Sequence, residues 1–268
     1  MRLPPFTPSI GESALKEIAA RLKSIENDHD VRILFAIESG SRAWGFPSPD
    51  SDYDVRFVYA HAMDWYITLT PGRDVIEQPI VDDFDIGGWD IRKALNLLVK
   101  PNPVLLEWLS SPIRYIWDDD ISSRLLALSK QTAYATACAQ HYLHLGEGHW
   151  RRHIGDEPRI NYKKYCYVLR PALAIRWIRL NPDEVPPMNI QDLSVRLDLD
   201  ADAIKSILRL LELKGKASEA ADGERIPLLD RLISDEFDWA RTASIKAEKQ
   251  QLREEADTVF RMIVKEQI

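Results

Sequence analysis

The sequence of 268 residues has few cysteines, few histidines and no long apolar run. Its two cysteines, Cys138 and Cys166, lack the paired spacing of a disulfide framework or a zinc knuckle, so we expect buried free thiols in a reducing compartment. No apolar window is long enough to span a bilayer, and residues 1–6 lack the apolar core of a signal peptide. These absences predict a soluble, cytoplasmic protein that does not enter a membrane.

Positive charge is also scarce, because 35 Lys and Arg face 42 Asp and Glu and the formal net charge is −7. Such a surface repels nucleic acid as a whole, so any RNA-binding site has to be a local basic patch. Residues 150–180 are a candidate, with eight basic and two acidic side chains, a net charge of +6, and interleaved aromatic rings. These residue types can bind phosphates and stack on bases. An amphipathic helix whose cations pair with acids elsewhere is the equally weighted alternative.

Four of the six histidines, His141, His144, His149 and His153, lie within thirteen residues. Their spacing places them in pairs on a helix face, which raises the possibility of a zinc site. Glycines interrupt the segment, however, and no cysteine or carboxylate stands at ligand spacing to complete a tetrahedral site. We therefore favour polar or RNA-facing histidines.

The stretch from residue 37 to residue 59 has the layout of a functional site. An apolar run ends at Gly40-Ser41, a loop rich in Pro, Ser and Asp follows, and a second apolar run opens with two acids. Glycine permits a sharp turn, and a serine at a helix start leaves N–H groups available to an anion. Because side chains alternate along a strand, Asp52, Asp54 and Arg56 should project from one face.

Two adjacent carboxylates repel each other unless a cation neutralises them. Mg²⁺ suits such a pair, because it takes oxygen ligands and usually binds one or two carboxylates together with substrate phosphates. The stretch therefore predicts a metal pair beside a phosphate-binding turn, which is the equipment of nucleotidyl transfer.

The order of Gly40-Ser41 and Asp52-x-Asp54 resembles the signature of the DNA polymerase β nucleotidyltransferase superfamily. The fuller strings Gly-Ser-Arg-Ala-Trp-Gly from residue 40 and Ser-Asp-Tyr-Asp-Val-Arg from residue 51 resemble its RNA-repair-associated branch, as do segments 85–90 and 102–112. The resemblance covers roughly residues 30–180. It implies transfer of a nucleoside monophosphate from an NTP to an acceptor hydroxyl, with release of pyrophosphate. The implied acceptor is an RNA end, tRNA included.

The resemblance also implies two metal ions, Mg²⁺ with Mn²⁺ as the alternative, held by Asp52, Asp54 and a third carboxylate on a neighbouring strand. Asp82, Asp83, Asp85 and Asp90 are the candidates. Asp85 stands inside an apolar alternation where an acid is costly without a function, whereas Asp90 precedes a helical segment and suits an N-cap. We expect Asp85 at the metal and Asp90 at the cap.

Donor-phosphate binding is expected from Gly40, Ser41 and Arg42, with a lysine on a later helix. By analogy with the superfamily, that lysine is Lys163, and Lys164 is the second choice. Arg170 lies two helical turns beyond Lys163 on the same face, so it is expected to contact phosphate as well.

The expected fold class is α+β. Residues 1–120 should form a catalytic domain, a small mixed sheet with flanking helices, and residues 121–268 an all-helical domain that closes the active-site cleft. Within these domains, Glu107 is expected to be a solvated helical acid, with a buried partner of an arginine as the alternative. The principal elements expected are a helix over 11–27, strands over 31–37 and 54–59, short strands over 75–77 and 81–86, and helices over 91–99, 122–146 and 161–180.

Two other functions remain open from the sequence. Transfer to a hydroxyl of a protein or small molecule would use the same carboxylates, and a non-catalytic nucleotide-binding or antitoxin-like partner would keep the fold without turnover. Three costly carboxylates beside Ser41 favour an enzyme over a binding module. The sequence indicates neither the base preference nor the oligomeric state.

Overall fold

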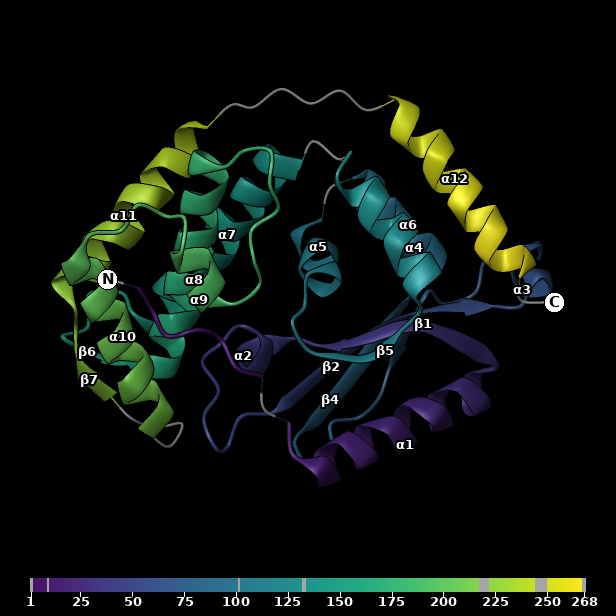
Figure 1. Ribbon diagram of the computed structural model, residues 1–268, viewed down its shortest axis with the longest axis horizontal. Helices are drawn as coiled ribbons and strands as arrows, with labels where there is room; N and C mark the ends of the chain where they lie inside the picture. The colour runs from purple at the N-terminus through teal and green to yellow at the C-terminus, as the bar shows by residue number, and fades with distance from the viewer. Residues whose placement is uncertain are drawn as a thin grey trace. The chain divides into compact units, whose positions relative to one another are not determined.

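The computed structural model describes residues 2–8, 10–100, 102–131, 134–216, 222–243 and 250–266 (Figure 1). The chain forms two compact units. The helical unit comprises Met1–Thr7, Ser41–Ser51 and Tyr134–Lys246, and the sheet unit comprises Pro8–Gly40, Asp52–Ala133 and Ala247–Ile268. The units thus interleave along the chain, whereas the predicted domains are separated by one cut at residue 120. The roles assigned to those domains stay a prediction.

A five-stranded mixed sheet is the centre of the sheet unit, with strand order β3-β4-β2-β1-β5. Strands β2 and β4 pair in parallel, and the other neighbours are antiparallel. The sheet and its flanking helices confirm the predicted α+β fold. The strands are β1 (Val31–Glu38), β2 (Tyr53–His61), β3 (Val75–Glu77), β4 (Phe84–Asp90) and β5 (Arg114–Trp117).

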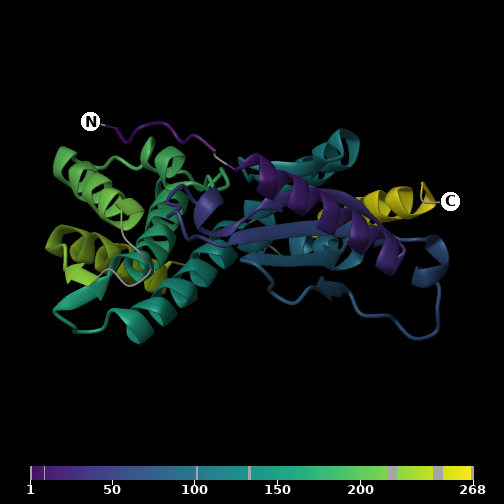
Figure 2. The ribbon, with the colours of Figure 1, turned by 90° about the horizontal axis from the view of Figure 1, so that it is seen from below.

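One face of this sheet packs against α1 (Glu12–His29) (Figure 2). Apolar α1 side chains at helical spacing join Val55, Phe57 and Tyr59 of β2 in one buried cluster, and each such burial contributes ~1.5–3 kcal/mol. Because these β2 residues face α1, the alternation directs Asp54 and Arg56 to the opposite face. On that face lie α4 (Ile91–Val99), α5 (Pro103–Leu109) and α6 (Asp119–Ser129), and the short α3 (Met63–Tyr66) and α12 (Gln250–Lys265) complete the unit.

The helical unit is built around α7 (Tyr134–His153) and α8 (Tyr162–Leu180), which pack side by side (Figure 1). Its two cysteines are buried free thiols, as predicted, and burial raises the pKa of Cys166 to about 12. None of the helices in the described ranges is both long and apolar enough to cross a membrane. The remaining elements are α2 (Gly40–Ala43), which begins with the last residue of the sheet unit, α9 (Ile190–Ser194), α10 (Ala201–Lys216), α11 (Pro227–Thr242), β6 (Arg159–Asn161) and β7 (Asp222–Glu224).

Two predictions about the second half of the chain are wrong. The single helix expected over 122–146 is two helices, because α6 ends at Ser129 in the sheet unit and α7 begins at Tyr134 in the helical unit. The region expected to be all-helical also contains the antiparallel pair β6–β7. Strands of three residues are too short to show an alternating pattern.

The prediction that Glu107 is solvated is also wrong, since this residue is 6% exposed. Its helix α5 is apolar on all sides, and Trp108 of this helix stacks on Trp89 of β4 with ring centroids 4.0 Å apart. Packing of the whole helix into the interior therefore buries an acid that helical periodicity alone places at the surface.

Glu236 of α11 is the centre of a buried ion-pair network in the helical unit. Its carboxylate is 2.8 Å from Arg176 Nη1 and 2.7 Å from Arg179 Nη2, and the residue is 1% exposed. Two of the eight cations of the basic stretch are thus neutralised inside the unit, as the amphipathic-helix alternative required.

We expect Glu236→Ala to lower the free energy of unfolding by about 2–3 kcal/mol, because it leaves two partly buried guanidinium groups without their carboxylate. Urea unfolding measures the loss. Asp235→Ala, an exposed acid on the same helix, is the matched control and should change stability by less than ~0.5 kcal/mol. Equal losses in the two variants would contradict this account of the network.

Candidate active site

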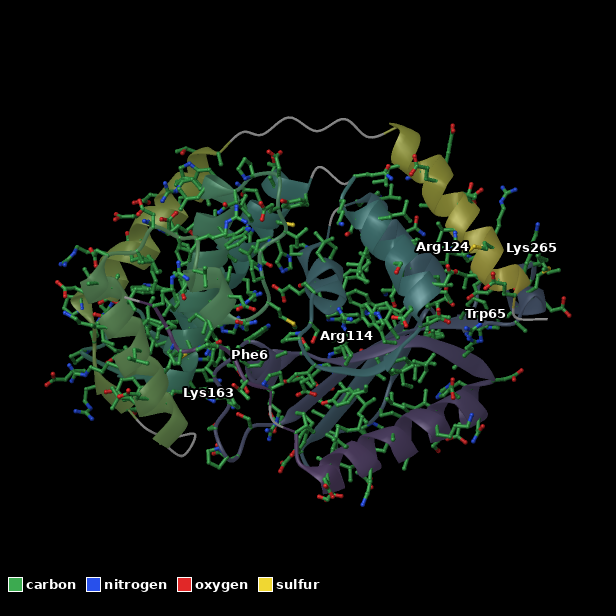
Figure 3. All side chains as sticks on the ribbon, viewed as in Figure 1. Phe6, Trp65, Arg114, Arg124, Lys163 and Lys265 are labelled. Atoms are coloured by element: carbon green, nitrogen blue, oxygen red, sulfur yellow. The ribbon has the colours of Figure 1, made fainter. Side chains whose placement is uncertain are left out.

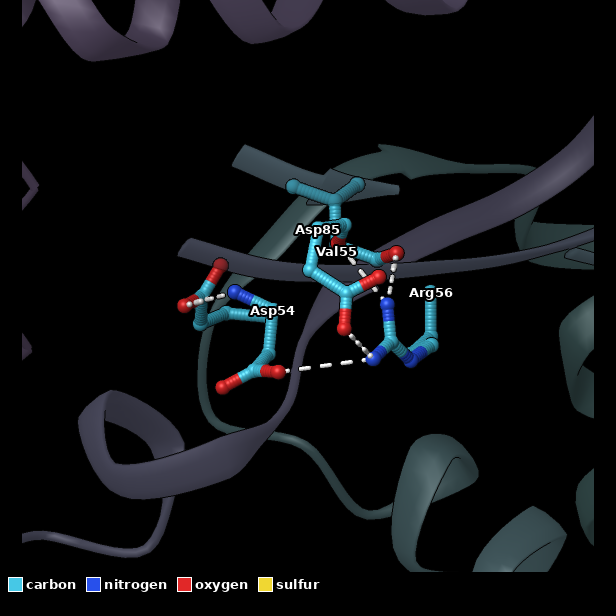
Figure 4. Close-up of polar contacts among 5 residues, drawn as sticks. Asp54, Val55, Arg56 and Asp85 are labelled. Atoms are coloured by element: carbon cyan, nitrogen blue, oxygen red, sulfur yellow. Dashed lines mark hydrogen bonds and ion pairs between the residues drawn. The ribbon is translucent and has the colours of Figure 1, made fainter. Parts of the chain in front are cut away.

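The carboxylates of Asp54 and Asp85 converge on one cation. The two residues are register partners on the parallel strands β2 and β4. Arg56 Nη2 lies 3.4 Å from Asp54 Oδ1 and 2.6 Å from Asp85 Oδ2 (Figure 4). Arg56 Nη1 donates to the backbone oxygens of Asp85 (2.8 Å) and Val55 (3.1 Å). The expected projection of Asp54 and Arg56 from one face is therefore observed.

Gly40 packs directly against this pair. Its φ is +56°, and a Cβ atom at this position would lie 1.8 Å from Asp54 Oδ2. A backbone hydrogen bond beside it holds the turn against β2, since Ser39 N donates to Asp54 O at 2.8 Å. Glycine is required here for both conformation and space, so the Gly-Ser turn and the first acidic strand depend on each other.

Glu38, the last residue of β1, has a supporting role that the sequence did not reveal. It is fully buried, its Oε1 accepts from Asp54 N at 3.0 Å, and its Oε2 accepts from the Tyr115 hydroxyl at 2.6 Å. The Ser111 hydroxyl donates to Glu38 O at 2.7 Å. An acid that ends an apolar run is the signal that could have identified it, because such a charge is costly unless hydrogen-bonded.

Asp90 is the N-cap of α4, as expected. Its carboxylate accepts from Arg92 N and from the Tyr66 hydroxyl, both at 2.7 Å, and burial raises the pKa of Asp90. Its register partner is Tyr59, five positions along the strand from the Asp54–Asp85 pair. Asp85 is therefore the acid that faces Asp54.

The Asp54–Asp85 pair suits a divalent cation, since it offers carboxylate oxygens that already converge on one positive group. Within the described residues, no three His, Cys, Asp or Glu side chains are arranged to hold a metal together. Two carboxylates are nevertheless the usual protein share of a Mg²⁺ site that substrate phosphates complete. Asp52 precedes β2 and is exposed, and its metal role stays a prediction.

The loop between Gly40-Ser41 and Asp52-x-Asp54 is held by a buried network of serine hydroxyls within the helical unit. The Ser51 hydroxyl oxygen accepts from the Ser41 hydroxyl at 3.0 Å and from Ser48 N at 2.9 Å. Lys214 Nζ of α10 donates to Ser48 Oγ at 2.9 Å and to Ser51 Oγ at 3.4 Å. Arg42 Nη2 donates to Ser51 O at 2.6 Å. Because α2 is a single turn, the loop depends on these contacts rather than on a helix dipole.

Lys214 is a buried lysine that sequence reasoning missed, because it ends an ordinary amphipathic segment. Burial lowers the pKa of its ammonium group to about 8, and the positive charges of Lys163 and Arg42 act in the same direction. Lys163 lies at the start of α8 (Figure 3). Arg42 and Lys214 thus both donate to the serine loop, and the charge of the predicted Lys163 acts on Lys214.

Arg170 lies in the interior of the helical unit. It is 1% exposed, Nε donates to Met188 O at 3.2 Å, and its guanidinium lies 5.4 Å from the ring centroids of both Trp44 and Tyr142. Its predicted contact with phosphate stays a prediction.

Part of the basic stretch is exposed at the end of α7. The guanidinium groups of Arg151 and Arg152 donate to backbone carbonyls one turn earlier, which carry no full charge. His149 and His153 stack there with centroids 5.9 Å apart, and burial lowers the pKa of His149. The part of the chain that the structure describes offers these histidines no three-ligand metal group.

Comparison with known proteins identifies the relatives of this chain. The RlaP model, described as the RNA repair pathway DNA polymerase beta family, matches residues 15–262. The chain belongs to this family. This RlaP-family member is therefore a polymerase β-type nucleotidyltransferase, as predicted. It is 39% identical over 254 residues to "Uncharacterized protein YcgL" of Bacillus subtilis (strain 168), with 94% of this chain and 96% of that protein covered.

A crystal structure of a nucleotidyltransferase-like protein from Exiguobacterium sibiricum 255-15 is a more distant match to the RlaP-family chain. The match covers 93% of this chain and 80% of the other, with 12% identity and a TM-score of 0.27. A likeness of this size carries no argument about the site.

Lys214→Met provides a pH test of the buried lysine. In the folded protein the pKa of Lys214 is about 8, whereas an unfolded lysine titrates near ~10.4. Between these values the unfolded state binds more protons, so the stability of the native protein relative to the variant should rise with pH. Below about pH 8 the difference should be constant.

Thermal unfolding of both proteins from pH 7 to 10.5 measures this difference. Lys205→Met, an exposed lysine on the same helix, is the control and should give a constant difference from the native protein throughout. A constant difference for Lys214→Met as well would show that Lys214 titrates normally.

Proposed function

We propose that this RlaP-family protein transfers a nucleoside monophosphate from an NTP to a hydroxyl at an RNA end, tRNA included, and releases pyrophosphate. The observation that carries the reaction is the convergence of Asp54 and Asp85 on one cation beside the Gly40 turn. The family description, an RNA repair pathway, supports the RNA acceptor. Such a reaction belongs in the cytoplasm, where NTP and RNA are both present.

Asp52, Asp54 and Asp85 would hold two Mg²⁺ ions, or Mn²⁺ in their place. When bound, such ions neutralise charge on the phosphoryl oxygens and activate the attacking hydroxyl. Gly40 lets the backbone come close to the carboxylate pair, and Glu38 holds the Asp54 backbone in place. We assign Asp85 a role in activating the attacking hydroxyl of the acceptor.

Donor phosphates would bind Ser41, Arg42 and Lys163, with Gly40 shaping the turn. Lys214 supports this role because it holds Ser48 and Ser51 in a fixed network. Cationic and hydroxyl donors that are already in place lose little free energy to reorganisation when charge develops on the phosphates. Preorganisation of the loop is therefore what these contacts would contribute to phosphate binding.

The RNA acceptor would bind the exposed cations at the end of α7 and the partly exposed cations at the start of α8. Arg151 and Arg152 are exposed, and Lys163 and Lys164 follow one short strand later. The Lys164 ammonium lies 6.0 Å from the ring centroid of Tyr167. A local patch is needed because the net charge of the chain, −7, disfavours RNA elsewhere.

We expect label from α-³²P-NTP and Mg²⁺ to enter total RNA with the native protein and to fall at least ~100-fold with Asp54→Asn. The substitution keeps the size of the side chain but removes a carboxylate charge that would hold the metal ions, and these ions would stabilise the transition state. Whole-cell protein is labelled in parallel, and Asp257→Asn, an acid of α12 far along the chain, is the matched control that should retain full activity.

Label that enters protein instead of RNA would replace the RNA acceptor with a protein hydroxyl. Absence of Asp54-dependent label from both pools would contradict both macromolecular acceptors and leave a small-molecule acceptor or a non-catalytic partner.

Measurement of RNA binding tests the proposed RNA-binding cations separately from the transfer reaction. Arg151→Ala/Arg152→Ala should weaken binding of tRNA-sized RNA and lower the slope of log K against log salt by about 1–2, because each lost phosphate contact removes one released counterion. Fluorescence anisotropy at several salt concentrations measures both effects. The charge-matched control is Arg196→Ala/Lys205→Ala, which removes two cations paired with acids. Equal effects of the two double variants would show that total charge, not this surface, binds RNA.

A further inference from the structure

Arg56 is fixed more firmly than an ordinary strand arginine. Four hydrogen bonds hold its guanidinium group, two to carboxylates and two to backbone carbonyls. The side chain is 22% exposed, and those of Asp54 and Asp85 are 27% and 36% exposed. Solvent therefore reaches this group only in part, and its contacts are less screened than those of a surface ion pair.

The position of Arg56 follows from strand geometry. It stands two residues beyond Asp54 on the same face of β2, and Asp85 is the cross-strand partner of Asp54. A guanidinium group stays charged at every pH at which the protein is folded. It therefore keeps one positive charge against the two carboxylates, and its Nη2 occupies the side of their oxygens to which a cation would bind.

We infer that Arg56 is a positioning residue that competes with divalent cations for the oxygens of Asp54 and Asp85, and so keeps the affinity for free metal low. The inference rests on the proposed metal-dependent function. Its consequence is that metal binds firmly only together with nucleotide, because the triphosphate supplies further oxygen ligands and negative charge. The two backbone contacts of Nη1 would keep the guanidinium close by when Nη2 leaves the carboxylates.

The test is binding of Mn²⁺ alone, without nucleotide, followed by the loss of the electron paramagnetic resonance signal of the free ion. Arg56→Met should bind Mn²⁺ at least ~10-fold more tightly than the native protein, because a charge-assisted contact to both carboxylates no longer has to be broken. Arg56→Lys keeps the charge but not the forked contact, so its affinity should fall between the two. Arg73→Met, an exposed arginine of the same unit paired with Glu77, is the matched control and should equal the native protein.

Thermal unfolding keeps the inference testable if Arg56→Met is less stable. Without metal the variant should melt below the native protein, because the two carboxylates repel each other. Saturating Mn²⁺ should then raise its melting temperature more than that of the native protein, as tighter binding to the folded state requires.

The two proposals fail in different ways. If native binding of Mn²⁺ disappears in Asp54→Asn but Arg56→Met binds no more tightly, the inference about Arg56 is wrong and the proposed metal site stands. If neither the native protein nor Arg56→Met binds Mn²⁺, the inference and the metal site are both wrong.

Discussion

Parallel pairing of β2 with β4 is the interaction on which the candidate site depends. In this register Asp54 lies beside Asp85, and both point away from the face that packs on α1. Two carboxylates so placed would repel each other without a cation. The pairing survives because Arg56, on the same face of β2, contacts both acids. The hydrophobic packing of α1 fixes one face of the strands, and the Arg56 contacts offset the repulsion between the two carboxylates on the other.

Three other buried charged groups also have two polar or charged partners each. Glu38 accepts two hydrogen bonds at the end of β1, Glu236 pairs with two arginines, and Lys214 donates to two serine hydroxyls. A buried charge without partners costs several kcal/mol, so each group requires its neighbours to stay where they are. Glu38 and Lys214 hold the two segments that carry the functional motif, and rigidity there is what preorganised catalysis needs.

Some residues of the motif strings stabilise the fold. Asp90 caps α4, Asn102 caps α5, Ser111 binds the end of β1, and Trp89 stacks on Trp108. Sequence reasoning separated Asp90 from Asp85 correctly, because helix capping and apolar alternation are local rules. It placed Glu107 in solvent, and this residue is buried. Helical periodicity shows which residues share a face, but the elements that cover that face are distant in sequence.

By itself, the sequence determined the mixed α+β fold, the strand that carries Asp54 and Arg56, the glycine turn, the free thiols and the nucleotidyltransferase family. These features depend on short-range rules: alternation along a strand, the conformational freedom of glycine, and residue order within a motif. Tertiary structure decided the break between α6 and α7, the pairing of Asp54 with Asp85, and the roles of Glu38 and Lys214. These depend on contacts between segments far apart in the chain, and Lys214 meets Ser48 across 166 positions. Local residue patterns contain no information about such contacts.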